Sequence, residues 1–357
     1  MAVAARYLNR ELFWVFVVVV VVLLTVALGG RFIGYLQDAA LGKYAAESLL
    51  TIMWMRLPDF LQQLLPFAYY ISLLLTIGRV HAEQEMAVLQ GAGIGPGRLL
   101  IWLAPGSIAL TILVAFLSLS QTPANNALLE EFFDEQRANQ EFDATSPGVF
   151  RTYQRGSRVT YAESVSEDRR ILDHVFMSER RADNANITVW ADTGTQYVDA
   201  ETGSRFLLLK DGVRYEGRIG ERDYRVTQFA TMGQRLAVVE PAARGVEVDS
   251  VPTATLMRNS GAEYSAELHW RYALPVLTLV GTFLAVGLAR VKPRQGRFAQ
   301  VVPGVLIFVA YYLLLVMIQN AMRAGSWPLG VGLWPIHALF GLVGSVLIYA
   351  VARPAKA

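Results

Sequence analysis

Six long apolar runs and one long polar stretch determine the expected organisation of this chain. A bilayer core of about 30 Å requires about 20 apolar residues in a helix, and each run comes close to that length. The polar stretch separates the third run from the fourth. The pattern predicts six transmembrane helices with one large insertion between them. The runs cover residues 12–30, 57–77, 99–119, 272–288, 301–322 and 331–351.

The first run could be either a retained span or a secretory signal. Arg6 and Arg10 precede it, as they would in the charged start of a signal peptide. The run is longer than the 7–15 apolar residues of a signal, however, and no clear A-x-A cleavage site follows it. We therefore expect a retained membrane span.

Basic residues in the short connections indicate the orientation of the spans, because Lys and Arg concentrate in cytoplasmic loops. The observed bias favours both termini in the cytoplasm, which places the long insertion on the outer side. The inner segments carry Arg6, Arg10, Arg79, Arg98, Arg290, Lys292, Arg294, Arg297, Arg353 and Lys356. The short outer segments carry Arg31, Lys43, Arg56 and Arg323.

The second run contains two amides, Gln62 and Gln63, between Pro58 and Pro66. Buried amides need hydrogen-bond partners in hydrocarbon. One interpretation is hydrogen bonding between helices beside a proline kink. The other is a helix face that lines a cavity.

The insertion begins with a helical pattern over 123–142 and continues as short alternating segments. Arg155-Gly156-Ser157 separates two such segments and predicts a hairpin. Asp211-Gly212 predicts another tight turn. Seven or eight short strands with frequent turns indicate a small sandwich or jelly roll. An exposed sheet edge could accept a strand from another protein, although that is true of many sheets.

Composition supports a membrane protein and excludes several kinds of chemistry. Hydrophobic residues make up 54% of the chain, and charged residues make up 17%, which is below the roughly 25% of a soluble domain. The net charge of +2 offers no bulk basic field for nucleic acid. The absence of cysteine excludes disulfides and thiolate metal sites. His174 has no companion histidine, and neither G-x-S-x-G nor H-E-x-x-H occurs, so we predict no catalytic or metal-binding residues.

The segment between the second and third runs, residues 78–98, combines acidic residues with four glycines. No G-x-x-x-x-G-K-[ST] motif occurs in the chain, so these glycines do not form a phosphate-binding loop. Residues 81–90 instead predict a short helix that Gly91, Gly93 and Pro96 end. On this helix we expect Glu83, Glu85, Met86 and Leu89, with Val88 as a weaker candidate, to meet a partner protein. The alternative is a solvated connector whose carboxylates are screened by Arg79.

Four segments carry a resemblance to a known family: RYLNRE at 6–11, residues 65–94, AELHWRYALPV at 266–276 and KPRQGR at 292–297. Together with the six runs and the large insertion, they resemble the LptF/LptG permease family over nearly the whole chain. AELHWR and PRQGR are more like its LptF branch than its LptG branch. Lys292 stands where Asn is commoner in the family, a change we expect to be harmless.

The resemblance implies an α-helical membrane protein with six transmembrane helices and an inserted periplasmic all-β, jelly-roll-like domain. The corresponding divisions are 1–122, 123–265 and 266–357. It also implies a place in the inner membrane and a heterodimer with an LptG-like permease. A dimeric LptB-like ATPase and LptC- and LptA-like periplasmic proteins are the other implied partners. The implied substrate is lipopolysaccharide, and ATP and Mg²⁺ belong to the ATPase, so no cofactor is expected in this chain.

Residue roles also follow from the resemblance. Residues 79–95 correspond to the coupling helix of the family, whose typical glutamate falls on Glu85. Runs one and five correspond to the lateral gates. Arg31, at the end of run one, matches a position that is often basic and could bind a lipid phosphate in bidentate fashion; it could equally be an interfacial anchor. Arg56 and Arg323 are weaker candidates for the same role.

Two other functions compete with this one. A permease of the lipoprotein-releasing or cell-division type would have four spans in each chain. A signalling or scaffold protein would use the β domain to bind a ligand without transport, and it would purify without a homologous permease or an ATPase.

Overall fold

A computed structural model describes ten ranges of the chain, which divide into two compact units. The helical unit comprises Met1–Glu131 and Gly245–Ala357, and the sheet unit comprises Phe132–Arg244. The first part and the last part of the predicted insertion 123–265 therefore group with the helices. The ranges described are 2–40, 46–143, 148–153, 158–166, 171–180, 185–198, 205–218, 223–235, 247–289 and 300–352.

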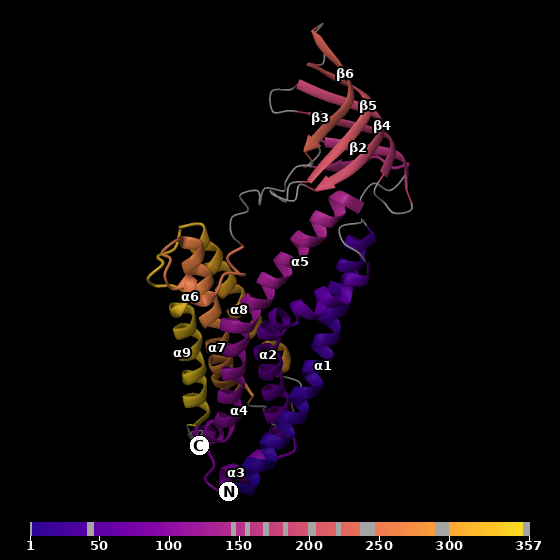
Figure 1. Ribbon diagram of the computed structural model, residues 1–357. Helices are drawn as coiled ribbons and strands as arrows, with labels where there is room; N and C mark the ends of the chain where they lie inside the picture. The colour runs from indigo at the N-terminus through magenta and orange to yellow at the C-terminus, as the bar shows by residue number, and fades with distance from the viewer. Residues whose placement is uncertain are drawn as a thin grey trace. The chain divides into compact units, whose positions relative to one another are not determined.

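Long apolar helices form the helical unit, in agreement with the predicted fold class (Figure 1). Five of them are long and apolar enough to cross a membrane: α1, α2, the continuous stretch that begins with α4, α7 and α8. The sixth, α9, is a shorter apolar helix. Five spans already exceed the four of the lipoprotein-releasing alternative. The helices are α1 (Ala2–Ala40), α2 (Leu49–Ala82), α3 (Glu85–Gly91), α4 (Pro96–Phe116), α5 (Thr122–Asp143), α6 (Thr253–Leu256), α7 (Ala262–Leu288), α8 (Val301–Arg323) and α9 (Trp334–Ala352), with a 3₁₀ turn η1 (Ala46–Ser48) and a π-helical turn η2 (Leu117–Gln121).

The core of the helical unit lies around α2 and α7, whose most apolar windows are 61% and 67% buried. The Tyr70 hydroxyl of α2 donates to the carbonyl of Gly304 in α8 at 2.8 Å. A side chain at Gly304 would collide with Leu74, so this close approach of α2 and α8 requires glycine. The corresponding window of α1 is only 6% buried. Helix α1 therefore exposes most of its apolar surface to lipid or to another protein.

The connection between α2 and α4 departs from the prediction at its start. We expected a helix over 81–90, but α2 continues to Ala82 and α3 begins at Glu85. Gln84 joins them with a left-handed backbone (φ 63°), which breaks the helix. The predicted end is confirmed: Gly93 has φ 79°, and Pro96 is the first residue of α4.

The sheet unit contains one antiparallel sheet whose described strands are ordered β1-β2-β3-β4-β5-β6, as in the chain. The all-β insertion is confirmed, and the predicted hairpin is the pair β1–β2, whose turn at 154–157 lies outside the described residues. Six strands are described where we expected seven or eight, because two of them are 14 residues long. The strands are β1 (Arg151–Tyr153), β2 (Arg158–Val165), β3 (Ile171–Arg180), β4 (Ala185–Val198), β5 (Arg205–Arg218) and β6 (Tyr224–Arg235).

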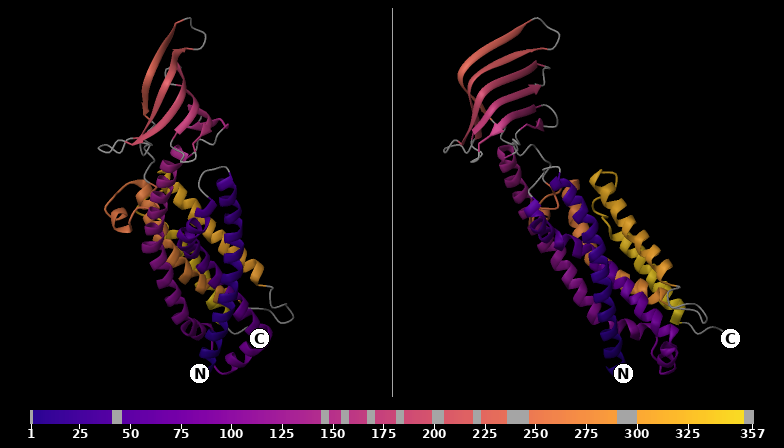
Figure 2. Two further views of the ribbon diagram at one scale, coloured as in Figure 1. Left: turned by 45° about the vertical axis from the view of Figure 1, so that its right-hand side comes forward. Right: turned by 90° about the vertical axis from the view of Figure 1, so that its right-hand side faces the viewer.

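The turn predicted at Asp211-Gly212 was wrong. A crease, by which we mean a line of unpaired residues across the sheet that includes Asp211 and His174, lies there instead. Asp211 and Gly212 both lie inside β5. Asp211 interrupts the pairing of β5 with β4 and β6 without changing the register, and its backbone is left-handed (φ 50°). His174 does the same in β3 (φ 49°). The crease curves the sheet (Figure 2), and the preference of Asp-Gly for left-handed backbone produces a bend here instead of a hairpin.

Several predicted features lie outside the described residues. They include the KPRQGR segment and the basic residues expected on the inner side after α7 and after α9. Their positions are 290–297, 353 and 356, together with Lys43 of the outer side.

Candidate functional site

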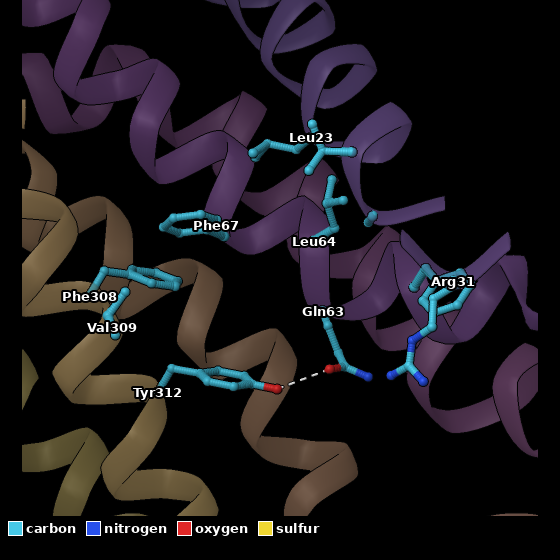
Figure 3. A pocket seen from close by; sticks show the side chains of 11 residues that line it. Leu23, Arg31, Gln63, Leu64, Phe67, Phe308, Val309 and Tyr312 are labelled. Atoms are coloured by element: carbon cyan, nitrogen blue, oxygen red, sulfur yellow. Dashed lines mark hydrogen bonds between the residues drawn. The ribbon is translucent and has the colours of Figure 1, made fainter. Parts of the chain in front are cut away.

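A cavity of about 530 Å³ lies between α1, α2 and α8 (Figure 3). Its wall is mostly apolar. The polar ends of Arg31, Gln63 and Tyr312 gather on one side of the cavity, and Leu23, Phe67 and Phe308 lie on the other. Such a cavity can hold an amphiphilic molecule whose apolar part is larger than its polar part. The lining residues are Leu23, Val26, Ala27, Arg31, Phe60, Gln63, Leu64, Phe67, Phe308, Val309 and Tyr312.

Hydrogen bonds between α2 and α8 fix the polar side of the cavity. The Tyr312 hydroxyl donates to Gln63 Oε1 at 2.9 Å. Gln63 Nε2 donates in turn to Asp59 Oδ1 at 3.2 Å, and Gln62 Nε2 donates to the same oxygen at 2.8 Å. Both interpretations of the two amides therefore hold. Gln63 lines the cavity and accepts a hydrogen bond from another helix, and Gln62 is buried and bonds to Asp59 of the same helix.

Arg31 is the cation of the cavity wall. Its guanidinium lies 5.9 Å from the centre of the Phe60 ring, and its side chain is exposed. Within the described part of the chain it makes no hydrogen bond and no ion pair. All five of its N–H donors are therefore available to an anionic group, such as a phosphate, that enters beside the cavity.

The structure does not bring the other two predicted head-group residues to this cavity. Arg56 Nη1 lies 3.4 Å from Asn126 Oδ1 in α5. Arg323 Nη2 donates to Glu267 Oε2 of α7 at 3.2 Å, and its side chain remains 46% exposed. Among the three predicted arginines, only Arg31 lines the cavity.

Only some of the side chains suggested for helix α3 are accessible on its surface. Met86 is 6% exposed and packs in the core of the helical unit, and Leu89 is partly buried against the same core. Neither side chain is free to enter a groove on another protein. Val88 is 74% exposed. Glu85 is partly exposed and has no hydrogen bond or ion pair with the described residues, so Glu85 and Val88 are the two suggested residues of α3 that remain accessible.

Glu83 belongs to a charged cluster that joins α1 to the end of α2. Arg79 Nη1 donates to Glu83 Oε2 at 2.6 Å, and Nη2 donates to the Tyr7 hydroxyl at 2.8 Å and to Glu11 Oε2. The sequence suggested the pair with Glu83 through its spacing of four residues, but it gave no sign of the contacts with α1. An apolar cavity of about 270 Å³ lies beside this cluster, lined by Ala4, Tyr7, Leu8, Val80, Glu85, Val88, Leu89 and Trp102.

A second arginine, Arg271 of α7, organises the chain where the insertion returns to the helices. Nε donates to Glu267 Oε1, Nη1 to Val251 O and Thr253 Oγ1, and Nη2 to the carbonyls of residues 248 and 249. These bonds use all five guanidinium N–H groups. Arg271 is 2% exposed and Glu267 is 5% exposed. The spacing of Glu267 and Arg271 within AELHWR was the available signal for this pair.

Three carboxylates also meet near this return segment. Oxygens of Glu130, Glu247 and Asp249 lie within 4.8 Å of one another. Ser250 Oγ donates to Glu130 Oε2 at 3.0 Å, and Asn126 Nδ2 lies 3.4 Å from Asp249 Oδ2. Two of the three carboxylates are thus hydrogen-bonded to neighbouring side chains of the helical unit. We therefore treat the cluster as part of the contact between α5 and the return segment.

Comparisons with known proteins agree on one family. The profile described as "Lipopolysaccharide export system permease LptF/LptG" matches residues 6–350. The chain is 26% identical over 348 residues to the protein named lipopolysaccharide export system permease protein LptF in Escherichia coli strain K12. That alignment covers 96% of this chain and 93% of the relative. The LptF of Shigella flexneri matches with the same identity and coverage.

Proposed function

Because the chain belongs to the LptF/LptG family of lipopolysaccharide export permeases, we propose that it is the permease subunit of an ABC-type complex. The complex would extract lipopolysaccharide from the inner membrane and pass it to a periplasmic bridge toward the outer membrane. The chain is a multi-pass membrane protein, and members of its family are transport subunits and not catalysts. Hydrolysis of ATP would be the task of a partner.

The cavity between α1, α2 and α8 is the observation that carries this proposal. Its apolar wall suits acyl chains, and Arg31 stands beside it without a protein partner in the described structure. Lipopolysaccharide combines several acyl chains with an anionic head group. The cavity is too small for the whole lipid, so this wall would contact only part of it. The remainder would lie against a second permease.

Energetics explain why such a chain would need an external motor. Burying an acyl chain is worth about 0.8 kcal/mol per CH₂, so exposing several chains at once would cost tens of kcal/mol on the same scale. The lipid must therefore travel along a continuous apolar path, and energy must be supplied from outside that path. The chain contains no Walker loop of its own.

The proposed partners follow from the family and from α3. An LptG-like permease would complete the path, and a dimeric LptB-like ATPase would bind α3 through Glu85 and Val88. LptC- and LptA-like proteins would receive the lipid from the inserted sheet. Both termini and α3 would then be cytoplasmic, and the insertion would be periplasmic, as the distribution of Lys and Arg predicts.

Purification in mild detergent followed by reconstitution tests the proposal. We expect this chain to co-purify with a homologous permease and an ATPase, and we expect the complex to release lipopolysaccharide from proteoliposomes in the presence of ATP. Arg31→Glu should lower lipopolysaccharide-stimulated ATP hydrolysis, because a carboxylate repels the lipid phosphates. Arg31→Lys is the matched control and should retain part of the stimulation, since it keeps the charge but loses the bidentate geometry.

Two results would count against this function. Purification of the chain alone as a monomer would favour the scaffold alternative. Unchanged stimulation in Arg31→Glu would make Arg31 an interfacial anchor and remove the cavity as the head-group site.

A further inference from the structure

Helix α1 is fastened to the rest of the helical unit at its N-terminal end. Leu8 and Leu12 are 4% and 3% exposed and belong to the core. Asn9 Nδ2 donates to the carbonyl of Trp102 in α4 at 2.8 Å. Arg79 adds the polar contacts with Tyr7 and Glu11 described above. Side-chain packing and hydrogen bonds therefore hold this end against α2 and α4.

The part of α1 between Phe16 and Arg31 packs less closely against the rest of the helical unit. Phe16 still packs edge to face on Tyr69 of α2, with ring centres 5.7 Å apart. Beyond this contact, Leu23, Ala27 and Arg31 line the open cavity. Val18, Val22 and Val26 are each more than half exposed. The N-terminal end of helix α1 is thus packed into the helical unit, whereas its part near Arg31 forms a wall of the cavity.

Arg79 lies in the last turn of α2, close in the chain to α3, and contacts the packed N-terminal end of α1. Glu83 follows α2 directly, and its side chain is paired with Arg79. Only the left-handed residue Gln84 separates Glu83 from α3. The same guanidinium binds Glu11 and Tyr7 of α1, so one side chain joins α1 to the end of α2, and two residues separate that end from the start of α3 at Glu85. Its side chain is 27% exposed, and those of Glu11 and Glu83 are 19% and 47% exposed.

We infer that Arg79 is a positioning residue that transmits movement of α3 to α1 and thereby changes the cavity. This inference rests on the proposed function, in which a partner ATPase displaces α3. Glu11 and Arg31 are 20 residues apart in α1, which corresponds to about 30 Å of helix. A tilt of about 10° at the packed N-terminal end would move the wall at Arg31 by about 5 Å over that length. Such a displacement is comparable with the width of an acyl chain.

The primary test separates ATP hydrolysis from lipid release in the reconstituted complex of this chain with its permease partner and ATPase. The variants are Arg79→Ala and Glu11→Gln, of which the second keeps the shape of the side chain. We expect both complexes to assemble and to hydrolyse ATP within twofold of the wild-type rate. Lipopolysaccharide released per ATP should fall at least fivefold, because the motor would no longer move the cavity wall.

Arg98→Ala is the matched control. Arg98 is an exposed arginine near the start of α4, close in the chain to α3, and its side chain makes no contact with the described residues that would tie it to α1. Its substitution removes the same charge without touching α1. We expect its release of lipid per ATP to equal that of the wild type.

A covalent link between the two helices tests the mechanical role directly. The chain has no cysteine, so Glu11→Cys combined with Arg79→Cys introduces the only thiols of this subunit. The double variant should be uncoupled. A short bifunctional methanethiosulfonate linker should restore at least half of the lipid release per ATP, and a reductant should abolish it again. A residue that merely stabilises the fold would not show this reversible rescue.

Each outcome has a separate meaning. The inference is overturned if Arg79→Ala releases as much lipopolysaccharide per ATP as the wild type does. It is also overturned if the linker does not raise the release per ATP of the double variant. It is also overturned if neither Arg79→Ala nor Glu11→Gln assembles, since Arg79 would then be a folding residue. A wild-type complex that hydrolyses ATP but releases no lipopolysaccharide would instead overturn the proposed function.

Discussion

Arg79 and Arg271 each bind several partners in the helical unit, but in opposite settings. Arg271 is 2% exposed and uses all five N–H donors. Three of its acceptors are backbone carbonyls of the return segment. The side chain of Arg79 is 27% exposed. Its acceptors are three side chains, and its buried Nε has no partner among the described residues.

The difference separates a structural arginine from one that can follow a movement. Backbone carbonyls cannot move without the chain that carries them, and a buried guanidinium loses much free energy if one bond is left unmade. Carboxylates on flexible side chains can follow a displaced partner, and water can solvate a partly exposed ion pair while it rearranges. We therefore expect substitutions of Arg271 to affect folding, and substitutions of Arg79 to affect transport.

Arg271→Ala should produce the largest effect. Removing the guanidinium leaves Glu267 as a buried carboxylate whose remaining partner is Arg323, and it orphans the carbonyls of residues 248, 249 and 251. Loss of one partner of a buried ion pair costs about 3–5 kcal/mol. The variant should show a strongly lowered melting temperature in detergent, or it should fail to accumulate. A loss below about 1 kcal/mol, at the level of an exposed ion pair, would contradict the structural role.

Arg271→Lys should lose less than the alanine variant and still be clearly destabilised. An ammonium offers three donors where the site uses five, and it cannot reproduce the planar fork. An unsatisfied buried polar group costs about 1–3 kcal/mol, so we expect a loss of about 2–3 kcal/mol. Arg79→Lys measured in parallel sharpens the comparison, because water can replace the missing bonds there. Equal losses at the two sites would remove the distinction between them.

The sequence predicts the helical part of the fold well, because membrane-spanning length and apolar composition are local properties. Run 301–322 corresponds closely to α8, and run 99–119 corresponds closely to α4 together with η2. The end of α3 is also predictable, since Gly93 and Pro96 act on their own backbone. The crease at Asp211 was not predicted, because the same dipeptide serves a hairpin or a bent strand, and the neighbouring strands decide which.

The candidate site is predicted less completely, because its contacts join distant parts of the chain. Glu11 and Arg79 are 68 residues apart, and no local pattern announces their pairing. The apolar positions Met86 and Val88 of α3 cannot be ranked from sequence, since the side that faces the core depends on how α3 docks. Arg31 could be selected because it ends an apolar run on the expected outer side. Its place beside the cavity follows from the packing of α1 against α2 and α8.

Arg79→Ala should have only a small effect on stability. Exposed ion pairs contribute about 0–1 kcal/mol, and the cluster that contains Arg79 is partly exposed. We expect the free energy of unfolding in detergent to fall by about 1 kcal/mol. This difference should shrink as salt is raised, because ions screen the pairs of Arg79 with Glu11 and Glu83. The wild type and the Arg271 variants provide the reference, since their difference should hardly depend on salt. A large, salt-independent loss in Arg79→Ala would place Arg79 with Arg271 as a structural residue.

Arg323→Gln should produce the smallest loss of stability. It tests whether an arginine that pairs with Glu267 contributes to stability through that ion pair alone or only when the arginine is also buried. Arg323 shares Glu267 with Arg271, but its side chain is 46% exposed. Arg271 still neutralises Glu267 in this variant, so no isolated buried charge results. We expect a loss of about 0.5 kcal/mol, which is the scale of exposed pairs, with Arg323→Lys close to the wild type in the same melting experiment. A loss of about 3 kcal/mol, the scale of a broken buried pair, would show that Glu267 depends on both arginines. The structural cluster would then extend to the end of α8.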